Sequence, residues 1–382
     1  MMAEFLKALS ARKHPGISAR AGLLTLVRQA APFVTRPSGR ARPPLTIYWS
    51  INSVCDLRCK MCDVGQREKG STFYRNLRID GRRHEIPLEL FKRVIDEVSP
   101  HRPMIAITST EPLLYRDLNE AIAHVRRRGM EMTITTGGYT LPDRAAGLAE
   151  AGLTRLNVSI DGPPAVHNDI RGRRDSFERS AEGIRRFKAA AAARNRTAEV
   201  LVNCTISNLN YGSLDRLIDA IDSLPVDRIN FSYMCFVDEA MATAHNARWG
   251  QRYPATVNCL NAQTDPGRVE VDVLDQQLRR LEQRRDPRIA LLPRFSRAAL
   301  GRYFRDPTTF MGRQRCMVNW FIAEIIATGE VIPYTRCYYV PFGNIHDRPF
   351  LDIWNGPAMR DWRRTLRRHR RFPACTRCDQ CY

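Results

Sequence analysis

Short apolar runs alternate with amphipathic stretches between residues 45 and 235. The runs are rich in β-branched residues, and each is followed by a turn and a stretch of about 10–18 residues with helical periodicity. The runs predict strands at residues 46–51, 104–108, 132–136, 155–160, 199–206 and 228–233. The amphipathic stretches predict helices at residues 88–98, 118–128, 142–151, 176–193 and 214–224.

This alternation predicts the fold class. Strands that alternate with helices pair in parallel and are joined by right-handed crossovers, which gives an α/β fold. Six such units predict an open, partial (β/α)6 barrel rather than a closed eight-fold one. In barrels of this kind the chemistry takes place at the carboxyl ends of the strands.

The periodicity fades outside this region. Four parts are therefore expected: a basic N-terminal arm at 1–44, the partial barrel at 45–235, a bridging region at 236–309, and a small C-terminal α+β domain at 310–382. The arm contains a short amphipathic pattern around Phe5, Leu6 and Leu9. The bridging region contains one charged amphipathic helix at 271–285, and a hairpin is expected around Thr328-Gly329-Glu330.

Charge changes this picture little. The chain has 382 residues and a formal net charge of +20 from 60 Lys and Arg against 40 Asp and Glu. Residues 1–44 contain eight basic residues against one acidic residue, and residues 356–382 contain eight against two. The chain therefore has a near-neutral body and two basic ends. These ends either are simply solvated or contact phosphate, an anionic lipid surface or an acidic partner.

The cysteines point to metal chemistry. No apolar stretch reaches the roughly 18 residues of a membrane span, and no signal peptide with a cleavage site is visible. We therefore expect a cytoplasmic protein. Cytoplasmic thiols stay reduced, so the eleven cysteines more often serve metals or catalysis than disulfides.

A first cysteine group follows directly after the first predicted strand. Cys55, Cys59 and Cys62 are separated by three and then two residues. Three thiolates on one loop can hold three irons of a cubane cluster and leave the fourth iron without a protein ligand. A structural zinc site needs four ligands, which this loop does not supply alone. The spacing indicates an open, reactive cluster.

This CxxxCxxC loop after the first strand of a partial barrel resembles the radical S-adenosylmethionine (SAM) superfamily. The resemblance implies a [4Fe-4S] cluster with an open iron that binds SAM. Many members of that family have an aromatic residue before the third cysteine, and its ring lies beside the adenine. This chain departs from that pattern with Met61, whose polarizable thioether can still pack on a purine face.

Further landmarks of the family occur in order. Ser109-Thr110-Glu111-Pro112 stands where the family has Gly-Gly-Glu-Pro, so the resemblance assigns Glu111 to the methionine amino group, although the two glycines are missing. Ser159 and Arg171 occupy positions that hold the SAM carboxylate or ribose, and an Arg fork suits a carboxylate. Gly137-Gly138 and Asn208 stand where the family approaches ribose and adenine.

A second cysteine group lies near the C-terminus. It resembles the SPASM or Twitch extension of one radical SAM branch, which implies one auxiliary [4Fe-4S] cluster, with structural zinc as the alternative. Cys204, Cys235 and Cys259 are expected in or near the core. The expected ligands are Cys316, Cys337, Cys375 and Cys378, with Cys381 as an alternative.

The resemblance implies an enzyme, a radical SAM oxidoreductase or a related modifying enzyme. It would cleave SAM reductively to a 5′-deoxyadenosyl radical that abstracts hydrogen from the substrate. An electron donor such as flavodoxin or ferredoxin is implied. No substrate base or radical quencher can be assigned from the sequence.

Three hypotheses for the substrate remain open. The first is a small anionic molecule that is sugar-like, cyclitol-like or lipid-linked. The second is a ribosomal precursor peptide that the enzyme oxidises or cross-links. The third is a non-enzymatic, basic metal-binding module on nucleic acid. For this third hypothesis the Arg-rich tail offers Trp354, Trp362 and Phe372 as stacking residues, but these fit a packed helix at least as well. Peptide maturases often carry a leader-binding domain before the cysteine loop, and only 44 residues precede Leu45. This favours the small molecule. The basic arm could contact a membrane surface peripherally.

Overall fold

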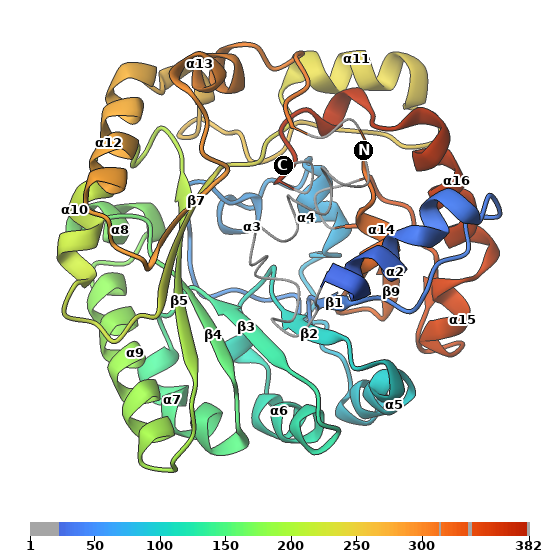
Figure 1. Cartoon of the computed structure of the whole chain (residues 1–382), viewed down its shortest axis with the longest axis horizontal. Coiled ribbons are helices and arrows are strands. Elements are labelled where there is room, and N and C mark those ends of the chain that lie inside the picture. Colours follow the sequence, from blue (N-terminus) through green and yellow to red (C-terminus); the bar gives the residue numbers. More distant parts are fainter. Residues whose placement is uncertain (1–22, 313–314, 335–337, 380–382) are drawn as a thin grey trace.

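A twisted, mainly parallel sheet forms the centre of the molecule (Figure 1). The computed structural model describes residues 23–312, 315–334 and 338–379. In this part of the chain ten strands follow the order β10-β9-β8-β1-β2-β3-β4-β5-β6-β7. The sheet curves into an open barrel, and the interior of the barrel is accessible at the carboxyl ends of the strands.

The six predicted strands are confirmed to within two residues. They are β1 (Thr46–Trp49), β2 (Met104–Ile107), β3 (Met132–Thr136), β4 (Arg155–Ser159), β5 (Glu199–Ile206) and β6 (Arg228–Tyr233), each parallel to the next.

Two further parallel strands extend this sheet, which the periodicity did not reveal. β7 (Ile289–Leu292) pairs with β6, and β8 (Ile322–Ile325) pairs with β1. The predicted hairpin is confirmed by the antiparallel pairing of β8 with β9 (Glu330–Ile332), to which β10 (Gly343–Asn344) adds. The hairpin of the C-terminal region therefore continues the barrel sheet through β8.

Helices cover the outside of the curved sheet (Figure 1). The predicted helices are present as α5 (Leu88–Val98), α6 (Leu118–Arg127), α7 (Leu141–Ala151), α9 (Ser176–Ala192), α10 (Leu214–Ile221) and α12 (Val271–Gln283). Shorter helices lie near the strand ends: α3 (Asp63–Gln66), α4 (Thr72–Asn76) and α8 (Pro164–Arg171). The 3₁₀ turns are Ser99–His101, Pro112–Leu114, Pro266–Arg268 and Pro373–Cys375.

Two helices of the bridging region were not predicted, α11 (Glu239–Trp249) and α13 (Arg297–Arg305). The reason is visible in α11, whose buried residues are Met241, Ala242 and His245. Because Ala242 is small and His245 is polar, the buried face of this helix does not appear in the sequence as a regular pattern of large apolar residues. The remaining C-terminal helices are α14 (Val318–Phe321), α15 (Phe350–Trp354) and α16 (Pro357–His369).

Much of the expected N-terminal arm is ordered. Residues Leu23–Thr35 form α2, which packs against α14 (Figure 1). Gln29 Nε2 donates hydrogen bonds to the carbonyls of Trp320 (2.7 Å) and Pro43 (2.9 Å). Leu24 and Val34 are exposed on the outer face, so apolar residues occur all round this helix and conceal its periodicity. The helix expected around Phe5, Leu6 and Leu9 lies outside the described residues.

No helix in the described ranges has the length and apolar character needed to cross a bilayer.

Candidate active site at the carboxyl ends of the strands

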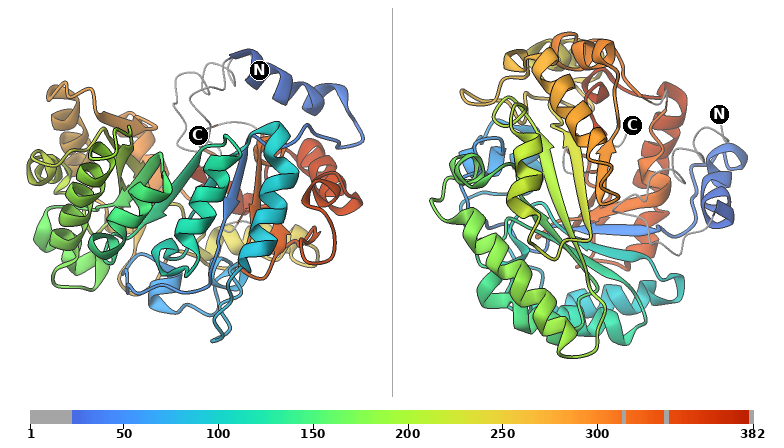
Figure 2. Two further views of the ribbon diagram at one scale, coloured as in Figure 1. Left: turned by 90° about the horizontal axis from the view of Figure 1, so that it is seen from below. Right: turned by 60° about the vertical axis from the view of Figure 1, so that its left-hand side comes forward.

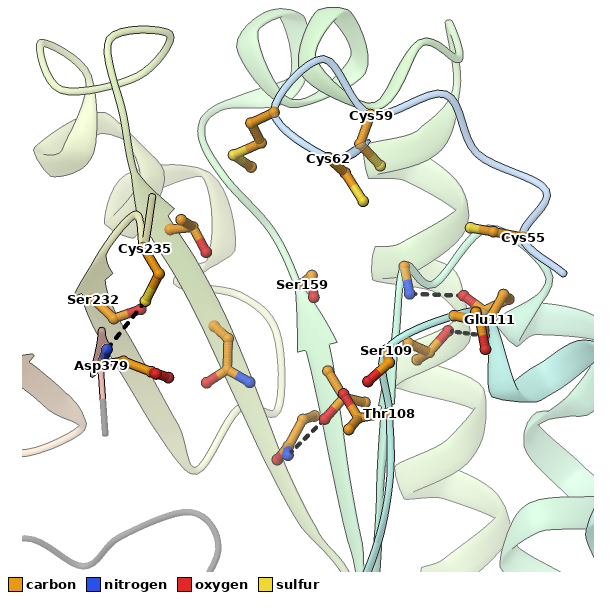
Figure 3. A pocket seen from close by; sticks show the side chains of 18 of the residues that line it. Cys55, Cys59, Cys62, Thr108, Ser109, Glu111, Ser159, Ser232, Cys235 and Asp379 are labelled. Atoms are coloured by element: carbon orange, nitrogen blue, oxygen red, sulfur yellow. Dashed lines mark hydrogen bonds between the residues drawn. The ribbon is translucent and has the colours of Figure 1, made fainter. Parts of the chain in front are cut away.

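A cavity of about 430 Å³ opens at the carboxyl ends of β1 to β6. Its walls include side chains from the loop after β1, from the strand ends and from the C-terminal region. Seven of the predicted site residues meet there: Cys55, Cys59, Met61, Cys62, Glu111, Ser159 and Arg171. Figure 3 shows the three thiols along one loop, with Ser232, Cys235 and Asp379 across the cavity and Ser159 between.

The cysteine loop rests on the C-terminal end of α8. Lys60 N–H donates to the Ile170 carbonyl over 2.8 Å, and Arg58 N–H donates to the Arg171 carbonyl over 3.4 Å. At the other end of the loop, Glu111 N–H donates to the Val54 carbonyl over 3.0 Å. Carbonyls at a helix C-terminus need donors, so loop and helix satisfy each other. This holds the loop over the cavity.

The donor set fits an iron–sulfur cluster better than a single metal ion. Cys59 is buried, Cys62 is half-buried and Cys55 is exposed. No three His, Cys, Asp or Glu side chains within the described ranges converge closely enough to hold one ion. A cubane cluster holds its thiolates around a larger body, with one Cys per iron. The three thiols face one cavity but are too far apart to bind a single ion together. This spacing suits a cluster in which each thiolate binds a different iron.

Arg171 lies beneath this loop. Its Nη2 forms a 2.5 Å ion pair with Asp161 Oδ2, and its Nη1 donates to Cys59 Sγ over 3.5 Å. Burial raises the pKa of Cys59 to about 11, while the Arg171 guanidinium opposes that rise. Arg171 Nε is buried and forms no hydrogen bond with a described residue, so one donor remains for a ligand.

Glu111 is anchored by protein groups. Its carboxylate accepts hydrogen bonds from Thr136 Oγ1 (2.8 Å), Gly137 N–H (2.8 Å) and Leu113 N–H (3.0 Å). Burial raises the pKa of Glu111 to about 7 in spite of these donors. Ser109 has a φ of 82°, the left-handed conformation that glycine adopts most easily. Ser109, which stands where the resemblance expects a glycine, therefore adopts a backbone conformation that glycine would adopt without strain.

The interior of the barrel is lined by hydroxyl and amide side chains, of which Ser159 alone was predicted from the sequence. Successive side chains of a strand point to opposite faces, so every second residue enters the cavity. Thr133 Oγ1 and Asn157 Oδ1 are buried and form no hydrogen bond with described residues. The polar positions at i and i+2 within the predicted strands were the available signal. The inward polar residues are Thr133 and Thr135, Asn157 and Ser159, Asn203 and Thr205, and Asn230 and Ser232.

The C-terminal region closes one side of the cavity. Asp379 N–H donates to Cys235 Sγ over 3.3 Å, and Tyr334 lies close to the Asp379 carboxylate. All three residues line the cavity. Cys204 and Cys259 are buried in the core, as expected, and Cys259 also lines the cavity. Cys235 is half-buried and contributes to the cavity wall.

Asn208 lies apart from this group. It is absent from the described lining. Its Nδ2 donates to the Gln263 carbonyl (2.9 Å), and its Oδ1 accepts from Asp265 N–H (3.1 Å).

The two glycines after β3 have different positions. Gly137 lines the cavity, whereas Gly138 has a φ of 84°, and a Cβ at this residue would overlap with Ser180 Oγ. A side chain at 138 would therefore collide, whatever the ligand.

The second cysteine group is seen in part. Cys316 is buried, and its N–H donates to the Arg370 carbonyl over 3.0 Å. Cys375 and Cys378 line one small cavity together with Tyr338, whose hydroxyl lies 3.3 Å from Cys375 Sγ. Cys337 and Cys381 lie outside the described residues.

Two segments of the chain match known domain profiles. Residues 49–206 match the profile described as the radical SAM superfamily. Residues 316–382 match the SPASM profile, described as an iron-sulfur cluster-binding domain. Both resemblances drawn from the cysteine spacing are confirmed.

Curated relatives are distant. Fe-coproporphyrin III synthase of Methanosarcina barkeri is 26% identical over 50% of this chain and 44% of its own length. Pre-heme d1 synthase of Dinoroseobacter shibae is 22% identical over 90% of this chain and 80% of its own length. The chain spans about half of the length of the first of these and of several other curated relatives that it matches.

The fold also matches a solved structure. SuiB of Streptococcus suis bound to SAM has a TM-score of 0.59 and 15% identity, covering 94% of this chain and 77% of that one. At this identity the likeness concerns the fold alone. It confirms the α/β class and the partial barrel.

Proposed function

We propose that this chain, an enzyme of the radical SAM superfamily with a C-terminal SPASM domain, removes a hydrogen atom from a small, hydroxylated organic substrate. A radical SAM domain implies a [4Fe-4S] cluster and SAM, and a SPASM domain implies auxiliary iron–sulfur binding. When bound, the cluster and SAM supply reductive C–S cleavage and hydrogen abstraction. The observation that carries the proposal is the convergence of the three thiols with Glu111, Ser159 and Arg171 on one cavity.

Each residue has a role in this proposal. The thiolates of Cys55, Cys59 and Cys62 hold the cluster. Glu111 Oε2 and the Ser159 hydroxyl receive and orient polar groups of SAM, and Arg171 Nε donates to its carboxylate. Met61 packs against the adenine. Bound SAM and substrate would displace water from the cavity around the reacting atoms.

The lining favours a neutral polar substrate over an anionic one. Arg171 is the sole cation among the described lining residues, and Asp161 already neutralises it. Glu111 and Asp379 place two carboxyl groups, and no further cation, in the same lining. The buried oxygens of Thr133 and Asn157 need hydrogen-bond partners, because a buried polar group without one costs about 1–3 kcal/mol. Hydroxyl groups of a sugar-like or cyclitol-like ring would supply them.

The C-terminal cysteines hold one auxiliary [4Fe-4S] cluster in this proposal. Its ligands come from Cys316, Cys337, Cys375, Cys378 and Cys381. Asp379, which directly follows Cys378, lines the reaction cavity, so the cluster would lie next to the substrate. It would take up the electron that an oxidised substrate radical loses. A flavodoxin or ferredoxin would reduce the first cluster.

A peptide substrate is the second candidate. The structure of SuiB bound to its precursor peptide SuiA covers 95% of this chain with a TM-score of 0.58. In that case a single side chain would enter the cavity of about 430 Å³, because pockets of this size hold one small ligand. A short precursor gene adjacent to this one would favour the peptide.

Anaerobic reconstitution tests the proposal. The full chain is loaded with iron and sulfide, then mixed with SAM and a strong reductant. We expect about eight irons per chain, as two cubanes require, and release of 5′-deoxyadenosine. The variant Cys55→Ala/Cys59→Ala/Cys62→Ala should lose this release, whereas Cys204→Ala, which removes a buried thiol outside both groups, should keep it.

Two results would overturn it. SAM cleavage that survives in the triple variant would refute the role of the first cysteine group. One zinc per chain without an iron–sulfur chromophore at the C-terminal group would refute the auxiliary cluster.

A further inference from the structure

A second pocket, of about 800 Å³, lies next to the reaction cavity. One wall is the segment 67–81, which follows the cysteine loop; the other contains Pro254, Thr256 and Tyr339. The two cavities share the short helix α4: Phe73 lines the reaction cavity, whereas Thr72 and Tyr74 line the second pocket. In Figure 2 (left) the light blue segment around α4 lies at the lower edge of the molecule.

This pocket is strongly cationic. Arg67, Lys69, Arg75 and Arg78 line it, and Asp80 is the one carboxylate among its described lining residues. Asp80 is engaged by its own loop, since its carboxylate lies 3.1 Å from His84 Nε2 and accepts from Arg82 N–H. The pocket therefore has little negative charge to offset its cations.

Three of the four cations have no carboxylate partner in the described part of the chain. Arg78 is neutralised, because it forms a two-pronged ion pair with Glu330 at 3.0 and 3.1 Å and also contacts the Tyr339 hydroxyl. Arg67, Lys69 and Arg75 are exposed and form no ion pair with a residue that the structure describes. Elsewhere in the described chain many arginines are paired, as Arg155 with Glu199 and Arg288 with Asp286.

The walls of the pocket are held by hydrogen bonds. Arg75 Nε donates to the Lys69 carbonyl over 3.2 Å, which closes the basic loop. Ser71 caps α4 by accepting from Tyr74 N–H. The hydroxyls of Thr72 and Thr256 lie 2.8 Å apart and join the two walls. Unneutralised cations gathered in a hydrogen-bonded concave site attract an anion, because the concave surface focuses their field.

We propose that this pocket binds the diphosphate group of a small organic molecule. A terminal diphosphate carries about three negative charges at neutral pH, since the second pKa of a phosphate is about 6. Three cations match that charge, and the guanidinium forks of Arg67 and Arg75 suit phosphate oxygens. The pocket is larger than a diphosphate needs, which leaves room for the organic part of the molecule.

This site lies outside the reaction cavity, and its test requires no radical chemistry. Binding of UDP to the reconstituted full chain is measured by calorimetry at low salt, without reductant and with saturating SAM. Uridine serves as the neutral counterpart, and inorganic pyrophosphate as the bare anion. UDP should bind at least about tenfold more tightly than uridine, a difference of about 1.4 kcal/mol. Its affinity should fall as salt rises.

A matched pair of variants separates a site from general charge. Arg67→Gln/Lys69→Gln/Arg75→Gln should weaken UDP binding at least about tenfold. Arg174→Gln/Arg185→Gln/Arg216→Gln removes the same charge from three exposed arginines away from the pocket and should leave the affinity within about twofold. Circular dichroism of both variants checks that the fold is intact.

Three results would overturn the proposal. They are an absence of UDP and pyrophosphate binding, equal affinity for uridine and UDP, and equal weakening by the two triple variants. Binding of pyrophosphate as tight as that of UDP would support a site for the diphosphate group alone. Tighter binding of UDP would support a site that also contacts the organic part.

Discussion

The guanidinium group of Arg171 donates a hydrogen bond to the sulfur of Cys59 over 3.5 Å, although 112 residues separate the two in the chain. Its other Nη pairs with Asp161 at 2.5 Å. The charge of Arg171 is therefore held against one of the expected cluster ligands. Hydrogen bonds to the sulfurs are among the factors that set the potential of an iron–sulfur cluster.

We expect removal of this hydrogen bond to lower the midpoint potential of the first cluster. The variant Arg171→Gln/Asp161→Asn removes both charges together, so that neither remains buried alone. A redox titration of the reconstituted protein followed by EPR measures the potential. Arg174→Gln, which removes an exposed arginine three residues further along the chain, is the control and should leave the potential unchanged. An unaltered potential in the double variant would contradict the tuning role.

Asp161→Asn alone should destabilise the fold more than the double variant does. It leaves the buried Arg171 cation without its counter-charge, and breaking a buried pair costs about 3–5 kcal/mol. Chemical denaturation of both variants measures the free energy of unfolding. Equal stability of the single and double variants would show that the pair is not coupled.

Thr133→Val should stabilise the protein by about 1 kcal/mol or more, because it removes a buried hydroxyl that has no partner among the described residues. The proposed substrate contact would be lost at the same time, so KM for the substrate should rise. The matched control is Thr136→Val. Its hydroxyl donates to Glu111, so that variant should lose stability by about 1 kcal/mol. Thermal unfolding of both variants is the measurement, and the two shifts should have opposite signs.

Gln29→Ala should destabilise the protein by about 1–3 kcal/mol. It leaves the buried carbonyl of Trp320 without its donor and loosens α2 from the C-terminal region. Arg28→Ala changes an exposed neighbour on the same helix and should shift the unfolding midpoint little. If both variants unfold alike, α2 does not contribute to stability through this contact.

His167 should make stability fall in mild acid. Its Nδ1 accepts from Asp161 N–H and its Nε2 lies 3.2 Å from Ser176 Oγ, and burial lowers its pKa well below the ordinary value. Above about pH 6.5 the imidazole is neutral in both states. Below that pH the unfolded state binds a proton that the folded state excludes, so stability drops by up to about 1.4 kcal/mol per pH unit.

The unfolding free energy of the wild type and of His167→Gln between pH 5 and 8 measures this effect. The difference between them should be constant above about pH 6.5 and should shrink below it. His101→Gln, an exposed histidine, should keep the wild-type profile.

The regular part of the fold was predictable because it depends on local periodicity. The first six strands lie where β-branched runs end in turns, and the helices between them show one apolar face each. α11 and β7 were not predictable in this way. Ala242 and His245 on α11 are buried without forming an apolar stripe, and the run Ile289–Leu292 is short enough to belong to a loop.

For the site, the sequence by itself determined what short spacing can determine. Cys55, Cys59 and Cys62 fall on one loop because three and two residues separate them, so their shared chemistry follows from covalent distance. The family followed from that spacing and from Glu111, Ser159 and Arg171 in their order. Whether those residues meet at one place depended on how the strands pair.

Only the tertiary structure decided which distant groups meet. It placed Arg171 against Cys59, gathered the polar residues of β3 to β6 into one lining, and brought Tyr339 to the basic segment 67–81. These contacts depend on strand register and on the closing of long loops. Neither leaves a local pattern, because a contact between residues far apart in the chain is stabilised by the packing of everything between them.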